Sequence, residues 1–270
     1  REIRDEYERA EALTGLAPHL PENLLPEALA TAREIRDEYQ RARALTGLAP
    51  YLPEILPEAL ATAREIGNEY QRARALTGLA PHLPENLLPE ALATAREIRD
   101  ESSRAEALTG LAPYLPENLL PEALATAREI GNEYQRARAL TGLAPHLPEI
   151  LLEALATARE IRDEYQRARA LTGLAPYLPE NLLPEALATA REIGNESSRA
   201  EALKALTAQL TFANVDLSFW QDVLQALGSL TRPHFLETIP HLAPLMLHFG
   251  GLVALREVLQ GIRDVSRWWK

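Results

Sequence analysis

A repeat of 31 or 32 residues runs through most of this chain and limits what it can fold into. The motif RAxAL starts at Arg9, Arg41, Arg72, Arg104, Arg136, Arg167 and Arg199. Two repeats have lost one residue, where ENLLPEAL at 22–29 becomes EILPEAL at 54–60 and EILLEAL at 149–155. A loss tolerated there indicates a loop or a helix edge rather than a helix interior. The sequence therefore predicts an array of units stacked one on the next.

Each repeat is expected to form two helices, one over 36–52 and one over 24–35. Both segments place apolar residues at the i, i+3, i+4 and i+7 spacing of a helix face. These positions are Leu45, Leu48, Ala49 and Leu52 in the first helix and Leu25, Ala28, Leu29, Ala32 and Ile35 in the second. No segment alternates with period two, so no strands are expected. We predict an all-α fold, an α-solenoid of stacked helical hairpins that bury their apolar faces on their neighbours.

Two residues in the expected first helix are unfavourable there. Gly47 costs about 1 kcal/mol relative to alanine, and Pro50 removes a backbone hydrogen bond and crowds the carbonyl of Thr46. Because both recur in each repeat, we expect them to bend the first helix and to set the curvature of the array.

The chain is expected to have two domains. Residues 1–203 form about six repeats, and because Arg1 to Ile3 match the end of a second helix, we expect the first repeat to continue upstream. Residues 204–270 are expected to form a C-terminal cap with helices near 215–229, 232–248 and 251–267. The expected details are a helix cap at Asp216 or Asn214, kinks at Pro240 and Pro244, a turn at Gly250-Gly251, and a possible partner anchor at Trp268 and Trp269.

The repeat sequence resembles several known repeat families. The pattern ALxxLAPYLPENLLPEALATAREI is similar to tetratricopeptide and HEAT-type repeats, and both alternatives stay open because the aromatic pair and terminal proline of the former are absent. The sequence pattern RAxALTGLAPHLPExLLPEALATAREI also resembles repeats at the C-termini of bacterial multidomain signalling proteins with nucleotide-binding switch domains. This resemblance implies an interaction or sensor module of a larger protein in the bacterial cytoplasm.

The sequence offers no candidate catalytic, metal or cofactor site. Its carboxylates recur identically in each repeat, whereas an active site is normally a single place, so we expect solvated helix faces with i, i+4 ion pairs. His234, His241 and His248 lie seven residues apart, about 10.5 Å along a helix, which is too far for one zinc ion. The chain also has no cysteine. We therefore expect no enzyme activity.

Positions that differ between repeats are the candidate partner-binding residues. The residue after the first-helix proline alternates between histidine and tyrosine, at His19, Tyr51, His82, Tyr114, His146 and Tyr177. The residue after RA is arginine at Arg43, Arg74, Arg138 and Arg169, but glutamate at Glu106, where Ser102-Ser103 replaces Tyr-Gln. Neutral variation on a solvated face is one interpretation. The other is a His/Tyr ladder flanked by arginines, residue types suited to binding protein surfaces.

The charge distribution narrows the choice of partner. Residues 1–204 hold 23 basic and 34 acidic residues, and residues 205–270 hold five of each. An acidic array disfavours nucleic-acid binding. The sequence contains no run of about 18 apolar residues, so no membrane span is expected. The leading hypothesis is a scaffold that binds a protein or peptide. The alternative is a structural spacer or self-assembly module that associates through its open ends or its cap.

Overall fold

The computed structural model describes residues 5–211, 213 and 215–268, and the side chains up to residue 263. Within these residues the secondary structure is helical, with no strand. The contacts divide the chain into an N-terminal half, Arg1–Pro148, and a C-terminal half, Glu149–Lys270. The division falls at the second of the two shortened repeats.

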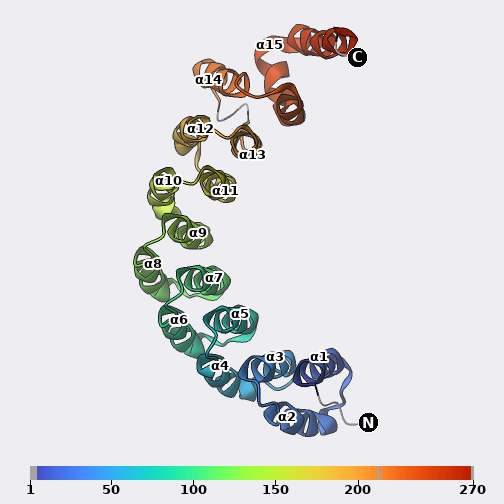
Figure 1. The fold of residues 1–270 in the computed structure, drawn as a ribbon, viewed down its shortest axis with the longest axis vertical. Coiled ribbons are helices and arrows are strands. Elements are labelled where there is room, and N and C mark those ends of the chain that lie inside the picture. Colours follow the sequence, from blue (N-terminus) through green and yellow to red (C-terminus); the bar gives the residue numbers. More distant parts are fainter. Residues whose placement is uncertain (1–4, 212, 214, 269–270) are drawn as a thin grey trace. The chain divides into compact units, whose positions relative to one another are not determined.

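The repeats form helical hairpins, as predicted. The N-terminal half contains α1 Glu6–Leu16, α2 Leu25–Arg33, α3 Glu38–Leu48, α4 Leu56–Glu65, α5 Glu69–Leu79, α6 Leu88–Arg96, α7 Glu101–Leu111, α8 Leu120–Arg128 and α9 Glu133–Leu143. In this half the first helices of the repeats (α1, α3, α5, α7, α9) lie along one side and the second helices along the other (Figure 1). The C-terminal half contains α10 Leu151–Glu160, α11 Glu164–Leu174, α12 Leu183–Arg191, α13 Glu196–Thr207, α14 Leu217–Leu227 and α15 Arg232–Trp268.

Each first helix begins at an aspartate or asparagine that caps it. The Oδ1 atom of Asp37 accepts a hydrogen bond from the backbone N–H of Gln40 at 2.8 Å, and Asn68 accepts from Gln71 at 3.0 Å. Such a cap satisfies one of the backbone donors left free at a helix start. The Arg-Asp and Gly-Asn pairs that precede the first helices, such as Arg36-Asp37 and Gly67-Asn68, are therefore equivalent helix starts.

The expected bend at Pro50 is wrong. Helix α3 ends at Leu48, two residues before the proline, and α5 ends at Leu79 and continues as a short 3₁₀ helix over Ala80–His82 with Pro81 at its start. A proline fits the first positions of a helix because no partner is needed there for its missing N–H. The proline therefore lies just past the end of the first helix and does not kink a longer one.

Most of the apolar residues that the helical spacing predicts to face the core are buried. Leu45 and Leu48 are fully buried and Ala49 is 1% exposed, whereas Leu52, four residues past the end of the helix, is half-buried. In the second helix Leu25, Ala28 and Ala32 are buried together with Ile35 beyond its end, while Leu29 is half-buried. The one-residue loss in the second repeat lies in the short 3₁₀ link Pro53–Ile55, as expected for a position outside the packed helix.

The recurring glycine allows neighbouring first helices to approach each other closely. A Cβ atom placed on Gly47 would lie 2.7 Å from Oγ1 and 3.0 Å from Cα of Thr14, and one on Gly142 would lie 2.9 Å from Oγ1 of Thr109. These distances are too short for real side-chain contacts. The glycine therefore offsets its helix-propensity cost by permitting tight packing of α3 on α1 and of α9 on α7.

The cap continues the repeat pattern for one more hairpin. Glu196 accepts a hydrogen bond from the backbone N–H of Thr231 at 2.7 Å, and Lys204 pairs with Glu237 at 3.1 Å. The arrangement resembles the links between successive repeats, so α14 and the start of α15 occupy the places of a second and a first helix. Asp216 caps α14 through the N–H of Phe219, as predicted.

Helix α15 turns sharply at Gly251, where φ is 61° and ψ is −164°. The predicted turn at Gly250-Gly251 is thus confirmed, whereas Pro240 and Pro244 lie within the helical part before it. One helix in the described part of the chain, Arg232–Arg263, is long and apolar enough to cross a membrane by length and composition, and 17% of its most apolar window is buried.

Candidate functional site

The predicted His/Tyr positions lie just after the first helices, and all six side chains are exposed. Tyr51, Tyr114 and Tyr177 are 41%, 41% and 43% exposed, so these tyrosines are not part of the core. Each position follows the proline at the end of a first helix, either in a turn or in a short 3₁₀ helix. The structure therefore leaves this set available to a partner.

A hollow of about 340 Å³ lies in the N-terminal half between α3 and α5 and brings part of the predicted set together. Of the predicted residues, it is lined by Arg43, Arg74 and His82. The further lining residues are Thr14, Tyr39, Thr46, Gly47, Pro50, Ala75 and Gly78. All of them come from first helices or the turns that follow them, so the hollow opens on the side of the first helices.

The hollow lies where two first helices are spaced more widely. A Cβ atom on Gly78 would be 3.9 Å from Cγ2 of Thr46, an ordinary contact distance, whereas the equivalent glycines at 47 and 142 leave no room. The hairpin between these two first helices contains the shortened link Pro53–Ile55. The α3–α5 interface thus differs from the α1–α3 and α7–α9 interfaces although its sequence is nearly the same.

The guanidinium groups of the two arginines in the hollow lie over tyrosine rings. The guanidinium of Arg43 lies 5.1 Å from the ring centroid of Tyr7 and donates a hydrogen bond to Gln40 Oε1 at 3.1 Å. The guanidinium of Arg74 lies 5.8 Å from the ring centroid of Tyr70. Stacking of this kind orients a guanidinium without neutralising its charge. Within the described residues neither arginine forms an ion pair with a carboxylate.

Phenol groups beside Arg74 favour its charged form. Tyr39 raises the pKa of Arg74 above its ordinary value most strongly, followed by Tyr70 and, least, by Glu106. Tyr39 is half-buried and lines the hollow but is not among the residues predicted from the sequence. The signal for it in the sequence is the variation of the Tyr-Gln pair between repeats.

The stacking joins two positions that vary between the repeats. Arg74 follows Tyr70 by four residues, and Arg169 follows Tyr165 by four residues with 5.8 Å between guanidinium and ring. Residues four apart share a helix face. Where serine replaces this tyrosine, at Ser102, the arginine position holds Glu106, and glutamate also follows a tyrosine in the first repeat, at Tyr7 and Glu11.

Some predicted site residues lie outside the hollow. Tyr51 and Tyr114 are exposed but do not line it, and neither does the half-buried Arg138. Trp269 and the side chain of Trp268 lie outside the described part of the chain. No group of three or more His, Asp or Glu side chains suited to a metal ion occurs in the residues described, which include His234, His241 and His248.

The charged residues of the array link repeats to one another, and the expectation of i, i+4 ion pairs is wrong for the main pairs. Arg33 binds Glu58 through two hydrogen bonds of 2.8 and 2.6 Å, and Arg64–Glu97 and Arg96–Glu129 join later repeats. Pairs between elements require the stacked geometry, which a single-helix rule does not contain. Because these side chains are about half exposed, solvent screens each pair and its contribution to stability is small.

The arginine of the RAxAL motif has a structural role that the sequence did not reveal. Arg41 donates to the carbonyl of Ile35 at 2.9 Å, and Arg72 and Arg199 donate to the carbonyls of Ile66 and Ile193 at 2.7 Å. These carbonyls follow the second helix of the preceding hairpin and lack a partner within it. The motif arginine thus closes the junction between hairpins and is not free for a ligand.

A glutamate at the start of several first helices joins repeats in a similar way. Glu101 accepts hydrogen bonds from the backbone N–H groups of Gly131 at 2.7 Å and Asn132 at 2.9 Å. The N–H of Gly131, and then that of Asn132, lowers the pKa of Glu101. A carboxylate that accepts backbone N–H bonds is stabilised in its charged form.

This link predicts a pH-dependent contribution to stability. A lowered folded-state pKa means that Glu101 stabilises the fold above its unfolded pKa of about 4.3, and that this contribution is lost as the pH falls through the lower folded value. We expect Glu101→Gln to lower the melting temperature by roughly 2 °C at pH 7. The difference from wild type should shrink as the pH is lowered to about 3.

Melting curves between these pH values test this prediction, and Glu117→Gln at an exposed position removes the same charge as a control. A difference for Glu101→Gln that stays constant with pH would show that the carboxylate does not act through its charge.

Comparisons with known proteins place the chain in no established family. No family model and no curated protein matches it. Among solved structures it is similar to Ton1535 from Thermococcus onnurineus NA1, with 18% identity and a TM-score of 0.34 over 90% of this chain and 93% of that one.

Proposed function

We propose that this chain is a non-catalytic repeat scaffold that binds a protein or peptide along the side of its first helices. The observation that carries the proposal is the hollow between α3 and α5, where Arg43 and Arg74 are stacked on aromatic rings and left without a carboxylate partner among the described residues. Tyrosine and arginine contribute most of the binding energy in many protein interfaces. A role as the sensor or interaction module of a larger bacterial signalling protein in the cytoplasm is part of this proposal.

The charges around the hollow suggest which peptides it would select. The array as a whole is acidic, whereas the hollow presents two guanidinium groups with His82 at its edge. Opposite charges across an interface favour the correct partner and repel others. A peptide with acidic side chains at its centre should therefore bind better than a basic one of the same length.

Binding of fluorescent peptide pools of acidic, neutral and basic composition, followed by anisotropy, tests the proposal. We expect acidic peptides to bind wild type, and Arg43→Ala combined with Arg74→Ala to weaken binding at least about tenfold, since each anchoring residue contributes 1 kcal/mol or more. The matched control is Arg64→Ala with Arg96→Ala, which removes the same charge from exposed second-helix positions.

Two results would contradict the proposal. Equal loss of binding in the hollow variant and in the control would show that net charge, not the hollow, decides binding. Absence of binding by any pool to the folded wild type would remove the support for a peptide site. Self-association remains the alternative proposal, and sedimentation of the free protein separates the two.

A further inference from the structure

The cap exposes apolar side chains of a different kind from those of the repeats. In the repeats most large exposed apolar residues are tyrosines, at 7, 51, 70, 114, 165 and 177. In the cap they are aliphatic: Leu217, Leu224, Leu247, Leu252, Val253 and Leu259. The described aromatic residues of the cap, by contrast, are buried or half-buried. An exposed group of aliphatic side chains marks an interaction surface.

Four of these residues lie on either side of the turn in α15, and we call them the aliphatic surface: Leu247 before the turn and Leu252, Val253 and Leu259 after it. They are 46%, 66%, 65% and 56% exposed, and no side chain described after the turn is fully buried. The stretch 238–255 around the turn contains no Asp, Glu, Lys or Arg. Leu247, Leu252 and Val253 therefore lie in a stretch without charged side chains, whereas Leu259 follows the exposed Arg256 and Glu257.

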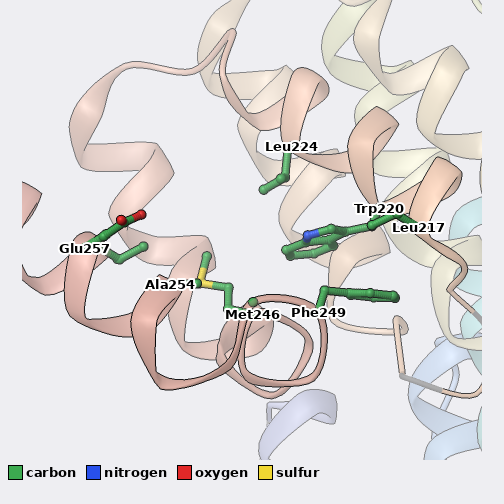
Figure 2. A pocket seen from close by; sticks show the side chains of 9 residues that line it. Leu217, Trp220, Leu224, Met246, Phe249, Ala254 and Glu257 are labelled. Carbon is green, nitrogen blue, oxygen red and sulfur yellow. The ribbon is translucent and has the colours of Figure 1, made fainter.

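A neighbouring hollow of about 470 Å³ extends the apolar character of the cap. Trp220 and Leu224 of α14 lie on one side of it, and Met246 and Phe249 of α15 lie on the other (Figure 2). Trp220 and Phe249 stack with ring centroids 5.8 Å apart. The hollow is lined by α14 and by Ala254, Glu257 and Val258 of the final part of α15.

Exposed arginines accompany the leucines after the turn. Leu252 and Leu259 are seven residues apart and therefore share a face, and Arg256 and Arg263 each follow one of them by four residues. Both arginines are exposed. A helix with aliphatic side chains bordered by arginines suits the interface of a bilayer, because the long arginine side chain reaches the headgroups while the leucines enter the acyl region.

We propose that the final helical segment of α15, residues 251–268, binds the surface of an anionic lipid bilayer and lies in its plane. Leucine and valine are under-represented among the residues that dominate protein interfaces, which favours lipid over a protein partner. The charge of the segment fits such a surface, because residues 251–268 hold three basic residues (256, 263 and 267) and two acidic ones (257 and 264), whereas residues 1–204 are strongly acidic. The turn at Gly251 and the packing of the first part of α15 on α13 fit a segment that lies on the bilayer rather than one that spans it.

Flotation of the 270-residue protein with vesicles tests the proposal directly. Vesicles of phosphatidylcholine with about 30% phosphatidylserine should carry the wild type upward, and pure phosphatidylcholine vesicles should carry less. The variant Leu252→Gln, Val253→Gln, Leu259→Gln should bind at least about tenfold more weakly. Its control is Leu16→Gln, Leu24→Gln, Leu152→Gln, which changes three exposed leucines of the array.

A label reports which residues meet the lipid. Because the chain contains no cysteine, Val253→Cys or Tyr51→Cys gives a single position for an environment-sensitive fluorophore. We expect its emission to shift to the blue with anionic vesicles at position 253 and to stay unchanged at 51. In addition, Arg256→Gln with Arg263→Gln should weaken binding about fivefold or more on anionic vesicles only.

Three outcomes would overturn the proposal. One is absence of flotation with folded wild-type protein, and another is equal loss of binding in the array control. The third is a lipid-free dimer in sedimentation that the cap variant dissociates while no label responds to vesicles, which would assign the aliphatic surface to a second copy of the chain.

Discussion

Replacing Gly47 with alanine is expected to destabilise the protein by about 1–3 kcal/mol, even though alanine is the better helix former. The added methyl group would lie 2.7 Å from Oγ1 and 3.0 Å from the backbone Cα of Thr14, so helices α1 and α3 would have to separate. The same change at Gly78 should stabilise by roughly 0.5–1 kcal/mol, because its nearest neighbour, Cγ2 of Thr46, lies at 3.9 Å.

Urea unfolding of both variants measures the two effects. The positions are equivalent in the repeat, so they serve as each other's control. A matching sign for the two changes would contradict the unequal spacing of the first helices, and with it the structural basis of the hollow between α3 and α5.

Truncating Leu76 to alanine is expected to cost about 2–5 kcal/mol. Leu76 lies in α5 and is fully buried, as are the corresponding Leu45 and Leu108. The loss combines the transfer free energy of the removed carbons with the cavity that stays behind. Because each repeat is stabilised by its neighbours, the loss should also lower the stability of the flanking hairpins.

Chemical denaturation followed by circular dichroism checks this value. Leu16→Ala, at a position that is 53% exposed, is the control and should change stability by about 0.5 kcal/mol or less. A cost below about 1 kcal/mol for Leu76→Ala would mean that α5 does not pack as described.

The period and the apolar spacing predicted the fold closely. Leu45, Leu48, Leu25 and Ile35 were expected on buried faces and lie there. The turn at Gly250-Gly251 was predicted equally well, because glycine there adopts the positive φ that other residues avoid. Such features depend on local chemistry, which one sequence contains.

The errors came from links between repeats. The Glu101 bonds to the next junction and the Arg33–Glu58 pair span 25 to 31 residues, and no rule for one isolated helix reaches that far. The interpretation of Pro50 also failed, since a turn at the end of α3, rather than a bent helix, accommodates the proline.

The candidate site was predictable only in part. Arg43, Arg74 and His82 were chosen because they vary or alternate between repeats, and the structure brings them into one hollow. Tyr51 and Tyr114 belong to the same pattern but lie outside it. The hollow depends on a wider spacing between neighbouring first helices at Gly78 than at Gly47. Because the repeats are nearly identical in sequence, this difference could not be predicted from them.

Hydrogen–deuterium exchange with a bound peptide tests the central claim most directly. The peptide used is an acidic one that binds the wild type but does not bind the variant carrying Arg43→Ala and Arg74→Ala. The account predicts that saturation with this peptide slows exchange in α3, α5 and the turn at His82, and leaves the second helices α4 and α6 unchanged. Protection confined to the second helices or to the cap would contradict binding along the side of the first helices.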